Sequence, residues 1–345
     1  MKYRLLLFIT FFLLLSCSSK EDTIRLEKGI SLELAKYRKQ QVSNVVYHLD
    51  FDIPTTKTAP IPASLTLTLI IQDLTNDLFL DFNEAKSHLK SVNVNGDKTD
   101  INHQKEHLII SKKDLVLGEN TIVISFNAGE SSLNRNEDFL YTLLVPDRAS
   151  TLFPCFDQPD IKARYQLTIT APKEWEVLCG AFEESSIEMG DFTKHIFSQT
   201  DIMSTYLFSF VAGKFTSVTK NPGAFDMRFL YRENNQEKIE ESVDEIFSIH
   251  QKAIDFLEEY TQVKFPFQKM DFAAIPPFQY GGMEHVGAIQ YRASSLFLDK
   301  NATQNRKLSR AKLIGHETSH MWFGDLVTMR WFNDVWMKEV FANFM

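Results

Sequence analysis

The chain has 345 residues, of which 44% are hydrophobic and 24% are charged, a composition typical of a globular protein of about two domains. Its 37 Lys and Arg against 45 Asp and Glu give a formal net charge of −8, and no basic cluster alternates with aromatic residues. This charge pattern argues against nucleic acid as a partner. The sequence has no low-complexity tract and no evident internal repeat, which fits a globular protein.

The first residues have the pattern of an export sequence. Lys2 and Arg4 precede an apolar run at residues 5–15, which is too short to span a bilayer and has the length of a signal-peptide core. The segment LLSC that ends at Cys17 resembles a bacterial lipobox, whose cysteine carries a lipid. A plain secretion signal and a buried helix are the alternatives. We expect a signal peptide at residues 1–16, a lipid on Cys17 and a membrane-anchored protein of the bacterial cell envelope, on the periplasmic or the surface face of the outer membrane.

Strand patterns dominate the first part of the chain. Residues 17–40 are expected to form a polar tether with a short helix, and residues 41–220 a β-rich N-terminal domain. Its strands are expected at residues 65–69, at residues 92–94 before the hairpin turn Asn95-Gly96, and at residues 121–126 and 206–211. Cys155 and Cys179 lie in no Cys-x-x-Cys pattern, and the sequence leaves open whether they form a disulfide.

The pattern changes near residue 221. A strand at residues 225–231 is followed by apolar residues at helical spacing between residues 239 and 257. Strand and helix together indicate a second domain with mixed α and β structure. We assign it to residues 221–345.

A metal-ligand pattern lies near the end of the chain. His316 and His320 are four residues apart, so a helix there presents both imidazoles on one face, where they can bind one metal ion. Glu339, after eighteen intervening residues, can supply a carboxylate from a second helix and complete a three-ligand zinc site with an open fourth position. The alternative is a solvated helix that happens to carry two histidines.

This ligand set predicts one Zn²⁺ per chain and the chemistry of a metallopeptidase. Zinc lowers the pKa of its bound water towards about 7. Glu317 lies beside the metal rather than on it, and it can accept the proton as that water attacks a peptide carbonyl. Glu317 is therefore the predicted catalytic base.

The wider sequence resembles the M1 aminopeptidases. Residues 316–328 (HETSHMWFGDLVT), 331–334 (WFND) and 336–339 (WMKE) match the zinc region of that family, and residues 153–159 (FPCFDQP) match a landmark of its N-terminal domain. The resemblance implies a saddle-like β-sandwich followed by an α+β, thermolysin-like zinc peptidase domain. It also implies hydrolysis of the N-terminal bond of peptides.

A second block resembles the exopeptidase motif Gly-x-Met-Glu-Asn of this family, which is an edge strand beside the zinc. The block consists of Gly281, Gly282, Met283, Glu284 and His285, which we assign to substrate binding. The resemblance places the substrate's α-ammonium on the Glu284 carboxylate, which would hold it by a charge-assisted hydrogen bond. The two glycines allow close approach of a bound peptide. His285 stands where the family has Asn. The expected partners are peptides with a free N-terminus, and an endopeptidase is disfavoured because an amine-binding carboxylate has no role in internal cleavage.

Two functions remain open at the level of sequence. The chain stops at Met345, six residues after Glu339, whereas the family continues through the rest of the catalytic domain to a helical domain and supplies an oxyanion-stabilising tyrosine on the way. We expect either the front part of a zinc aminopeptidase, with an incomplete catalytic domain, or a catalytically weak or inactive lipid-anchored fragment that binds zinc or peptides. Side-chain preference cannot be predicted, because Leu143 and Val145 stand where many members have Gln and Glu.

Overall fold

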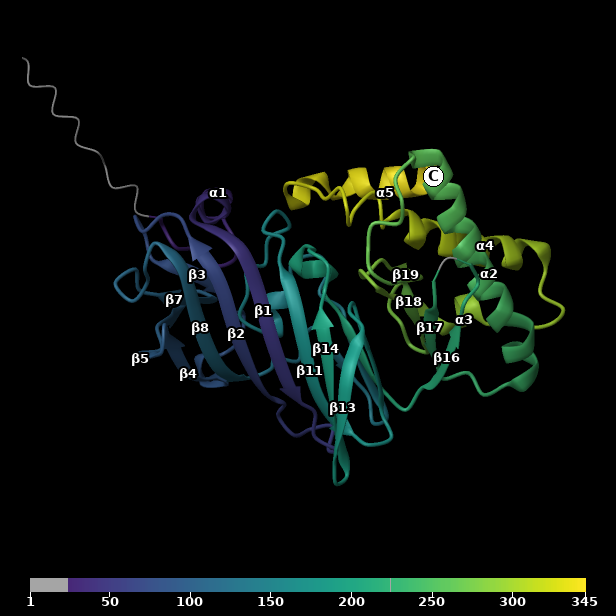
Figure 1. Cartoon of the computed structure of the whole chain (residues 1–345), viewed down its shortest axis with the longest axis horizontal. Coiled ribbons are helices and arrows are strands. Elements are labelled where there is room, and N and C mark those ends of the chain that lie inside the picture. Colours follow the sequence, from purple (N-terminus) through teal and green to yellow (C-terminus); the bar gives the residue numbers. More distant parts are fainter. Residues whose placement is uncertain (1–23, 224) are drawn as a thin grey trace, which may run out of the picture.

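The computed structural model describes residues 24–223 and 225–345. A β-rich unit is followed by a mixed unit that carries the longer helices, and the two lie side by side along the long axis of the molecule (Figure 1). The expected signal peptide and the lipid site at Cys17 lie outside the described residues. Within the described ranges, no helix has both the length and the hydropathy needed to cross a membrane.

The N-terminal unit is built on an eight-stranded sheet with the order β13-β14-β11-β1-β2-β8-β4-β5. Neighbouring strands are antiparallel except β1 and β11, which run parallel. The strands span Val42–Asp52 (β1), Pro62–Ile71 (β2), Leu89–Val94 (β4), Asp97–Thr99 (β5), Gly118–Asn127 (β8), Arg164–Pro172 (β11), Glu183–Met189 (β13) and Phe192–Gln199 (β14). Leu65, Leu67 and Leu69 of β2 are buried, which is the period-two pattern expected from the sequence.

Two smaller sheets pack with the large one around a single apolar core. They are the four-stranded β12-β15-β10-β9 (Glu176–Cys179, Phe210–Gly213, Phe139–Thr142, Leu133–Arg135) and the three-stranded β3-β7-β6 (Leu78–Asp81, His107–Ile110, His103–Gln104). The ring of Tyr165 stacks between Tyr47, at a centroid distance of 5.0 Å, and Phe208, at 4.5 Å. Cys155 and Cys179 are buried free thiols. The predicted β-rich domain is confirmed.

The second unit contains a five-stranded sheet with the order β16-β17-β18-β20-β19. The inner strands β17, β18 and β20 run parallel, and the edge strands β16 and β19 are antiparallel to their neighbours. The strands span Thr216–Lys220 (β16), Met227–Tyr231 (β17), Asp271–Ile275 (β18), Gly282–Met283 (β19) and Ala288–Arg292 (β20). The block expected to form an edge strand therefore does so as β19.

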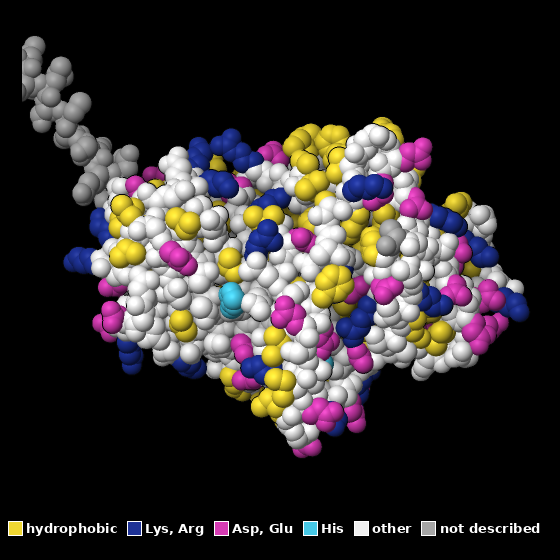
Figure 2. Space-filling model, in the orientation of Figure 1, with side chains coloured by type: hydrophobic (Ala, Val, Ile, Leu, Met, Phe, Trp, Pro, Cys, Tyr) yellow, Lys and Arg dark blue, Asp and Glu magenta, His cyan; other side chains and the backbone are white. Residues whose placement is uncertain are grey.

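The longer helices of the second unit gather beside this sheet (Figure 1). The helices of this unit span Gln236–Thr261 (α2), Ala293–Leu296 (α3), Gln304–Ser319 (α4) and Val335–Phe344 (α5), with a short 3-10 helix at Phe332–Asp334. The described part of the N-terminal unit has one α-helix, Leu32–Gln41 (α1), and 3-10 helices at Lys86–His88, Ala149–Thr151 and Thr205–Leu207. The Asn235 side chain caps α2 by accepting from the Lys238 N–H, and α2 buries Ile246, Phe247 and Leu257 against the sheet. Figure 2 shows hydrophobic side chains gathered over the region of α5, where Trp336 and Phe344 are among the exposed apolar residues.

One predicted strand was wrong in part. Residues 205–207 form a 3-10 helix, and β15 begins only at Phe210. The reason is a tertiary contact at Thr205, whose hydroxyl donates to the Phe156 carbonyl and accepts from the Tyr165 hydroxyl. These bonds fix a turn that the local pattern of alternating side chains does not reveal.

The segment expected to be a tether packs against the N-terminal unit in its second half. Residues 32–41 form α1, and the fully buried Arg38 makes two hydrogen bonds to Asp81 at 2.6 and 2.7 Å. His107 Nδ1 lies 2.8 Å from the same carboxylate. Because α1 buries Arg38 beside Leu34 and Ala35 and so has no continuous apolar face, the hydrophobic pattern did not predict its packing.

Two lysines join the two units, and Lys269 is the buried one. Lys162 of the N-terminal unit donates to the main-chain carbonyls of Asp325 at 2.9 Å and Leu326 at 3.0 Å. In the opposite direction, Lys269 donates to the carbonyls of Cys179 and Ala181, each at 3.0 Å. The first of these contacts holds the loop that follows α4, and that loop positions the candidate site.

A buried carboxylate in the FPCFDQP segment gives the fold a pH dependence. Asp157 is almost fully buried, its Oδ2 accepts the Ser150 N–H at 2.8 Å, and its own N–H donates to Asp81. Burial, with a further contribution from the Asp81 charge, raises the pKa of Asp157 to about 7. The folded protein therefore holds a proton here that the unfolded chain releases near pH 4.

We expect Asp157→Asn to become progressively more stable than the wild type between about pH 4 and pH 7. In the wild type the folded state binds more protons than the unfolded state in this window, so its free energy of unfolding falls as pH rises, by at most about 4 kcal/mol for a shift of this size. Asparagine has no such proton and can still accept from Ser150. Urea unfolding at a series of pH values measures the difference, with the exposed Asp97→Asn as control. Parallel pH profiles for Asp157→Asn and wild type would contradict the assignment.

Candidate metal centre

The two histidines of the predicted metal site lie at the end of α4. The helix is capped at its start by the Thr303 side chain, which accepts from the Arg306 N–H at 3.4 Å. His316 lies in its last turn and His320 is the residue that ends it. Their spacing places both rings on one face, and their Nε2 atoms are 3.2 Å apart.

Glu339 of α5 completes a group of three ligand atoms. Its Oε2 atom lies 3.4 Å from His316 Nε2 and 3.6 Å from His320 Nε2. Ligand atoms on a tetrahedral zinc with bonds of about 2.0–2.2 Å are separated by about 3.3–3.6 Å, close to the separations found here. Two imidazole nitrogens and one carboxylate oxygen are also a donor set that catalytic zinc uses. The three residues therefore fit zinc both in chemistry and in spacing.

Main-chain contacts orient His320 for this role. Its Nδ1 lies 3.0 Å from the Phe323 carbonyl, which can only accept, so we assign the proton to Nδ1 and leave Nε2 free as a donor of electrons. Gly324 follows in this turn with a φ of +142°, which favours glycine. A Cβ at this position would lie only 3.1 Å from His320 Nδ1. Burial alone would lower the pKa of His320, but the Glu284 and Glu339 carboxylates raise it to about 9. The cluster thus attracts positive charge.

Glu317 lies beside the three ligands. Its side chain is buried, and its carboxylate, that of Glu284 and a ring nitrogen of His320 all lie within 4.8 Å of one another. Burial and the neighbouring Glu284 charge raise the pKa of Glu317 to about 8. In the cluster without a metal ion this carboxyl can take up a proton near neutral pH, and a divalent cation beside it would favour the ionised form that a general base requires.

Gly282 leaves room for Glu317 at the point where β19 passes α4, and its expected contact with a bound peptide stays a prediction. A Cβ at position 282 would lie 2.4 Å from Glu317 Oε1 and 2.6 Å from its Cγ. At Gly281 the nearest atom would be Leu313 Cδ1, at 3.3 Å. Any side chain on Gly282 would displace the candidate base, so the edge strand β19 and α4 can approach only through a glycine.

Glu284 and His285 follow β19 and are both buried. The Glu284 carboxylate accepts a hydrogen bond from Lys338 of α5. Burial alone would raise the pKa of Glu284, but the Lys338 ammonium holds it well below its usual range. Burial lowers the pKa of His285 to about 4. Met283 is also buried, whereas Gly281 and Gly282 are partly exposed.

Lys338 is the site residue that the sequence analysis missed. It was part of the WMKE match, but a lysine on a helix is usually solvated, and nothing in its spacing indicated a buried partner. The available clue was its position directly before Glu339. The position alone does not predict burial, since Val340, on the other side of Glu339, is exposed.

A cavity of about 580 Å³ adjoins the ligand cluster. It lies between α2, α4 and the end of α5, and His316, Gly315, Phe256 and Phe344 are among the residues that line it. The cluster therefore lies at the wall of an open space rather than in a closed core.

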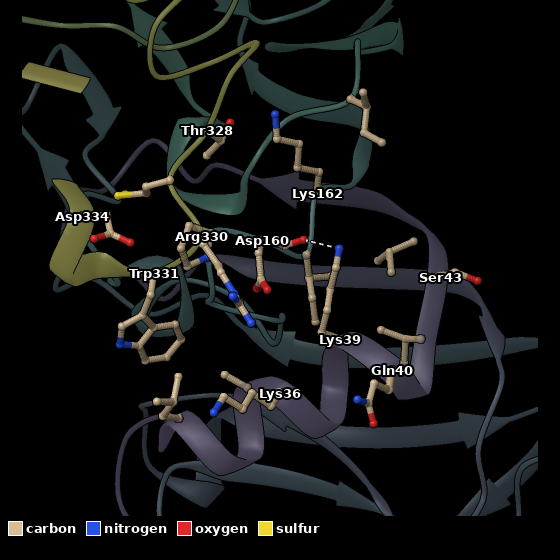
Figure 3. A pocket seen from close by; sticks show the side chains of 18 of the residues that line it. Lys36, Lys39, Gln40, Ser43, Asp160, Lys162, Thr328, Arg330, Trp331 and Asp334 are labelled. Atoms are coloured by element: carbon tan, nitrogen blue, oxygen red, sulfur yellow. Dashed lines mark hydrogen bonds between the residues drawn. The ribbon is translucent and has the colours of Figure 1, made fainter. Parts of the chain in front are cut away.

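A second cavity, of about 1250 Å³, lies away from the cluster (Figure 3). It is bounded by α1, the start of β1 and residues 328–334, and Lys36, Lys162 and Arg330 are among its lining residues. Lys39 donates to the main-chain oxygen of Asp160 at 2.7 Å across one wall. No ligand residue of the candidate metal centre lines this cavity, so we assign the function to the cluster.

Comparison with known proteins agrees with this geometry. Residues 43–207 match the model of the peptidase M1 N-terminal domain, and residues 246–345 match that of the peptidase family M1 domain. Together the two matches span most of the chain. The chain belongs to the M1 peptidase family. M1 peptidases are generally zinc-dependent.

Several aminopeptidases of the M1 family are similar in sequence. Probable aminopeptidase 2 of Sulfurisphaera tokodaii is 35% identical over 197 residues, which cover 57% of this chain and 25% of that protein. Glutamyl aminopeptidase of Sus scrofa is 35% identical over 201 residues, 58% of this chain and 21% of the relative. Puromycin-sensitive aminopeptidase of Caenorhabditis elegans is 34% identical over 217 residues, 61% and 22% of the two chains. The matched segment thus spans only about a fifth to a quarter of the length of these relatives.

We expect the 345-residue chain to bind one zinc ion. His320→Ala should bind zinc at least about 100-fold more weakly, because the variant loses a ligand whose orientation is fixed by the Phe323 carbonyl. Metal content after equilibrium dialysis and the zinc-dependent shift in melting temperature measure this. His48→Ala, which removes an exposed histidine, is the matched control. Undiminished zinc binding by His320→Ala would remove the assignment.

Proposed function

We propose that the protein is a zinc-dependent aminopeptidase that releases the N-terminal residue of peptides. The observation that carries the proposal is the convergence of His316, His320 and Glu339 on one point, with Glu317 and Glu284 beside them. Each of these groups has a separate part in such a reaction. Membership of the M1 family and the similarity to aminopeptidases support the same conclusion.

The first part of the chemistry is the activation of water. When bound, zinc supplies a Lewis acid that lowers the pKa of water and polarises the peptide carbonyl. Glu317 accepts the proton of the attacking water and passes it to the leaving amine. Its carboxylate lies close enough to Glu284 and His320 to receive that proton beside the metal.

The second part is recognition of the substrate's N-terminus. The Glu284 carboxylate lies within 4.8 Å of both the Glu317 carboxylate and a ring nitrogen of His320. An α-ammonium held there would place the first peptide carbonyl near the metal and the base, which limits cleavage to the terminal bond. An internal peptide bond has no ammonium at that distance.

We expect Glu284→Gln to reduce kcat/KM for a peptide with a free N-terminus by about 10- to 100-fold, the value of a charge-assisted hydrogen bond. The same peptide with an acetylated N-terminus should be a poor substrate already and should change little. The assay uses the complete polypeptide that carries this sequence, with Glu317→Gln as the background variant. Equal wild-type rates on the two peptides would refute an aminopeptidase and leave a zinc hydrolase.

We also propose that Cys17 carries the lipid that anchors the protein in the cell envelope, on the evidence of the LLSC segment and the preceding apolar run. Cys17→Ser should then lose membrane association and incorporate no labelled fatty acid in a bacterial host. Incorporation that survives the substitution would place the lipid elsewhere. Ser18→Ala, next to the lipid site, serves as the control.

A further inference from the structure

The Glu284 carboxylate already binds an ammonium group of this chain. Lys338 Nζ donates to Glu284 Oε1, and each side chain is only 4% exposed. A charge pair so far from solvent is weakly screened, so its ammonium is held more firmly than that of a surface lysine. The carboxylate that is expected to bind the substrate's N-terminus is therefore not vacant in the unliganded protein.

Two further contacts hold the Lys338 ammonium in place. Its Nζ lies 3.3 Å from Glu339 Oε1 and 5.4 Å from the centroid of the Tyr206 ring. Its aliphatic stem passes Gly324, where an added Cβ would lie 3.5 Å from Lys338 Cδ. Glu339 turns its other oxygen, Oε2, towards the two imidazoles, so Oε1 is the atom that remains for Lys338.

A peptide N-terminus and Lys338 carry the same chemical group. Both are primary ammonium ions that donate charge-assisted hydrogen bonds to a carboxylate. When the substrate binds Glu284, it gains one such bond and Lys338 loses a similar one, so the net gain is smaller than for a vacant carboxylate. Lys338 retains Glu339 Oε1 and the Tyr206 ring after this exchange, and neither ammonium is left without a partner.

We propose that Lys338 is a specificity-determining residue, whose ammonium competes with the N-terminal ammonium of a peptide for Glu284 and so sets how strongly the site prefers a free N-terminus. The inference rests on the proposed amine-binding role of Glu284. This role of Lys338 differs from structural support of α5, because the preference for a free N-terminus then depends on the Lys338 charge and on the Glu284 carboxylate.

The test measures binding rather than turnover. Zinc-loaded 345-residue protein is titrated by calorimetry with leucine hydroxamate and with N-acetyl-leucine hydroxamate, at pH 7, where an α-amino group is mostly protonated. The hydroxamate is common to both ligands, so the ratio of the two dissociation constants reports the amine alone. Lys338→Gln removes the charge and keeps a hydrogen-bond donor for Glu284, whereas Lys338→Arg keeps the charge.

We expect Lys338→Gln to raise the preference for the free amine about tenfold, as expected when a competing charge-assisted bond is removed, and Lys338→Arg to leave it close to that of the wild type. In a Glu284→Gln background, Lys338→Gln should have no effect on the preference, because the carboxylate for which the two amines compete is gone. An unchanged or smaller preference in Lys338→Gln, or a gain that persists without the Glu284 carboxylate, would overturn the proposal.

A measurement on the wild type tests the same point without a destabilising substitution. The side-chain ¹⁵N resonance of Lys338, assigned through Lys338→Arg, should shift when the free hydroxamate is added and remain in place with the acetylated one. If the Lys338 resonance does not shift on addition of the free amine, Lys338 and the ligand do not compete for Glu284, and the zinc assignment is unaffected. If the wild type binds neither hydroxamate, the proposed zinc and amine site is wrong, and the role of Lys338 is wrong with it.

Discussion

The contact between α4 and α5 at Glu339 is the interaction on which the candidate site depends. It brings two imidazole nitrogens and a carboxylate oxygen within 3.2 to 3.6 Å of one another. Three electron-donating atoms so close together are stable only when a cation or a proton lies between them. The cluster therefore favours a bound cation. The Lys338 ammonium adds a permanent positive charge beside it.

The N-terminal unit takes part in shaping this site. A Cβ at Gly180 would lie 2.6 Å from the Val286 carbonyl, and one at Gly287 would lie 2.9 Å from the Gly180 carbonyl. The β-rich unit therefore packs in direct contact with the loop that follows Glu284 and His285. Together with Lys162, which holds the loop after α4, it fixes both sides of the cluster. This explains how a β-rich domain without ligands of its own contributes to the site.

Glu284 and Glu317 show how one small region gives two carboxylates different properties. Both are buried, and burial alone would raise the pKa of each. Lys338 contacts Glu284 directly and lowers its pKa, whereas Glu317 faces the Glu284 charge and has a raised pKa. One group remains a fixed negative charge that suits an ammonium, and the other can take up a proton. Such a division of roles between neighbouring carboxylates is a common basis of acid–base chemistry in active sites.

The sequence by itself determined the parts of this protein that depend on local spacing. Helical and strand periods fix which side chains share a face, so the sequence predicted that His316 and His320 lie together, that β2 is a strand and that the first domain is rich in β structure. The position of Glu339 beside the histidines depends instead on the contact between α4 and α5. Only the tertiary structure decided the contacts between distant segments. Arg38 is anchored by Asp81, Gly282 makes room for Glu317, and Lys338 lies on Glu284, which is 54 positions away in the chain. No local pattern encodes such pairs, since each depends on how sheets and helices pack.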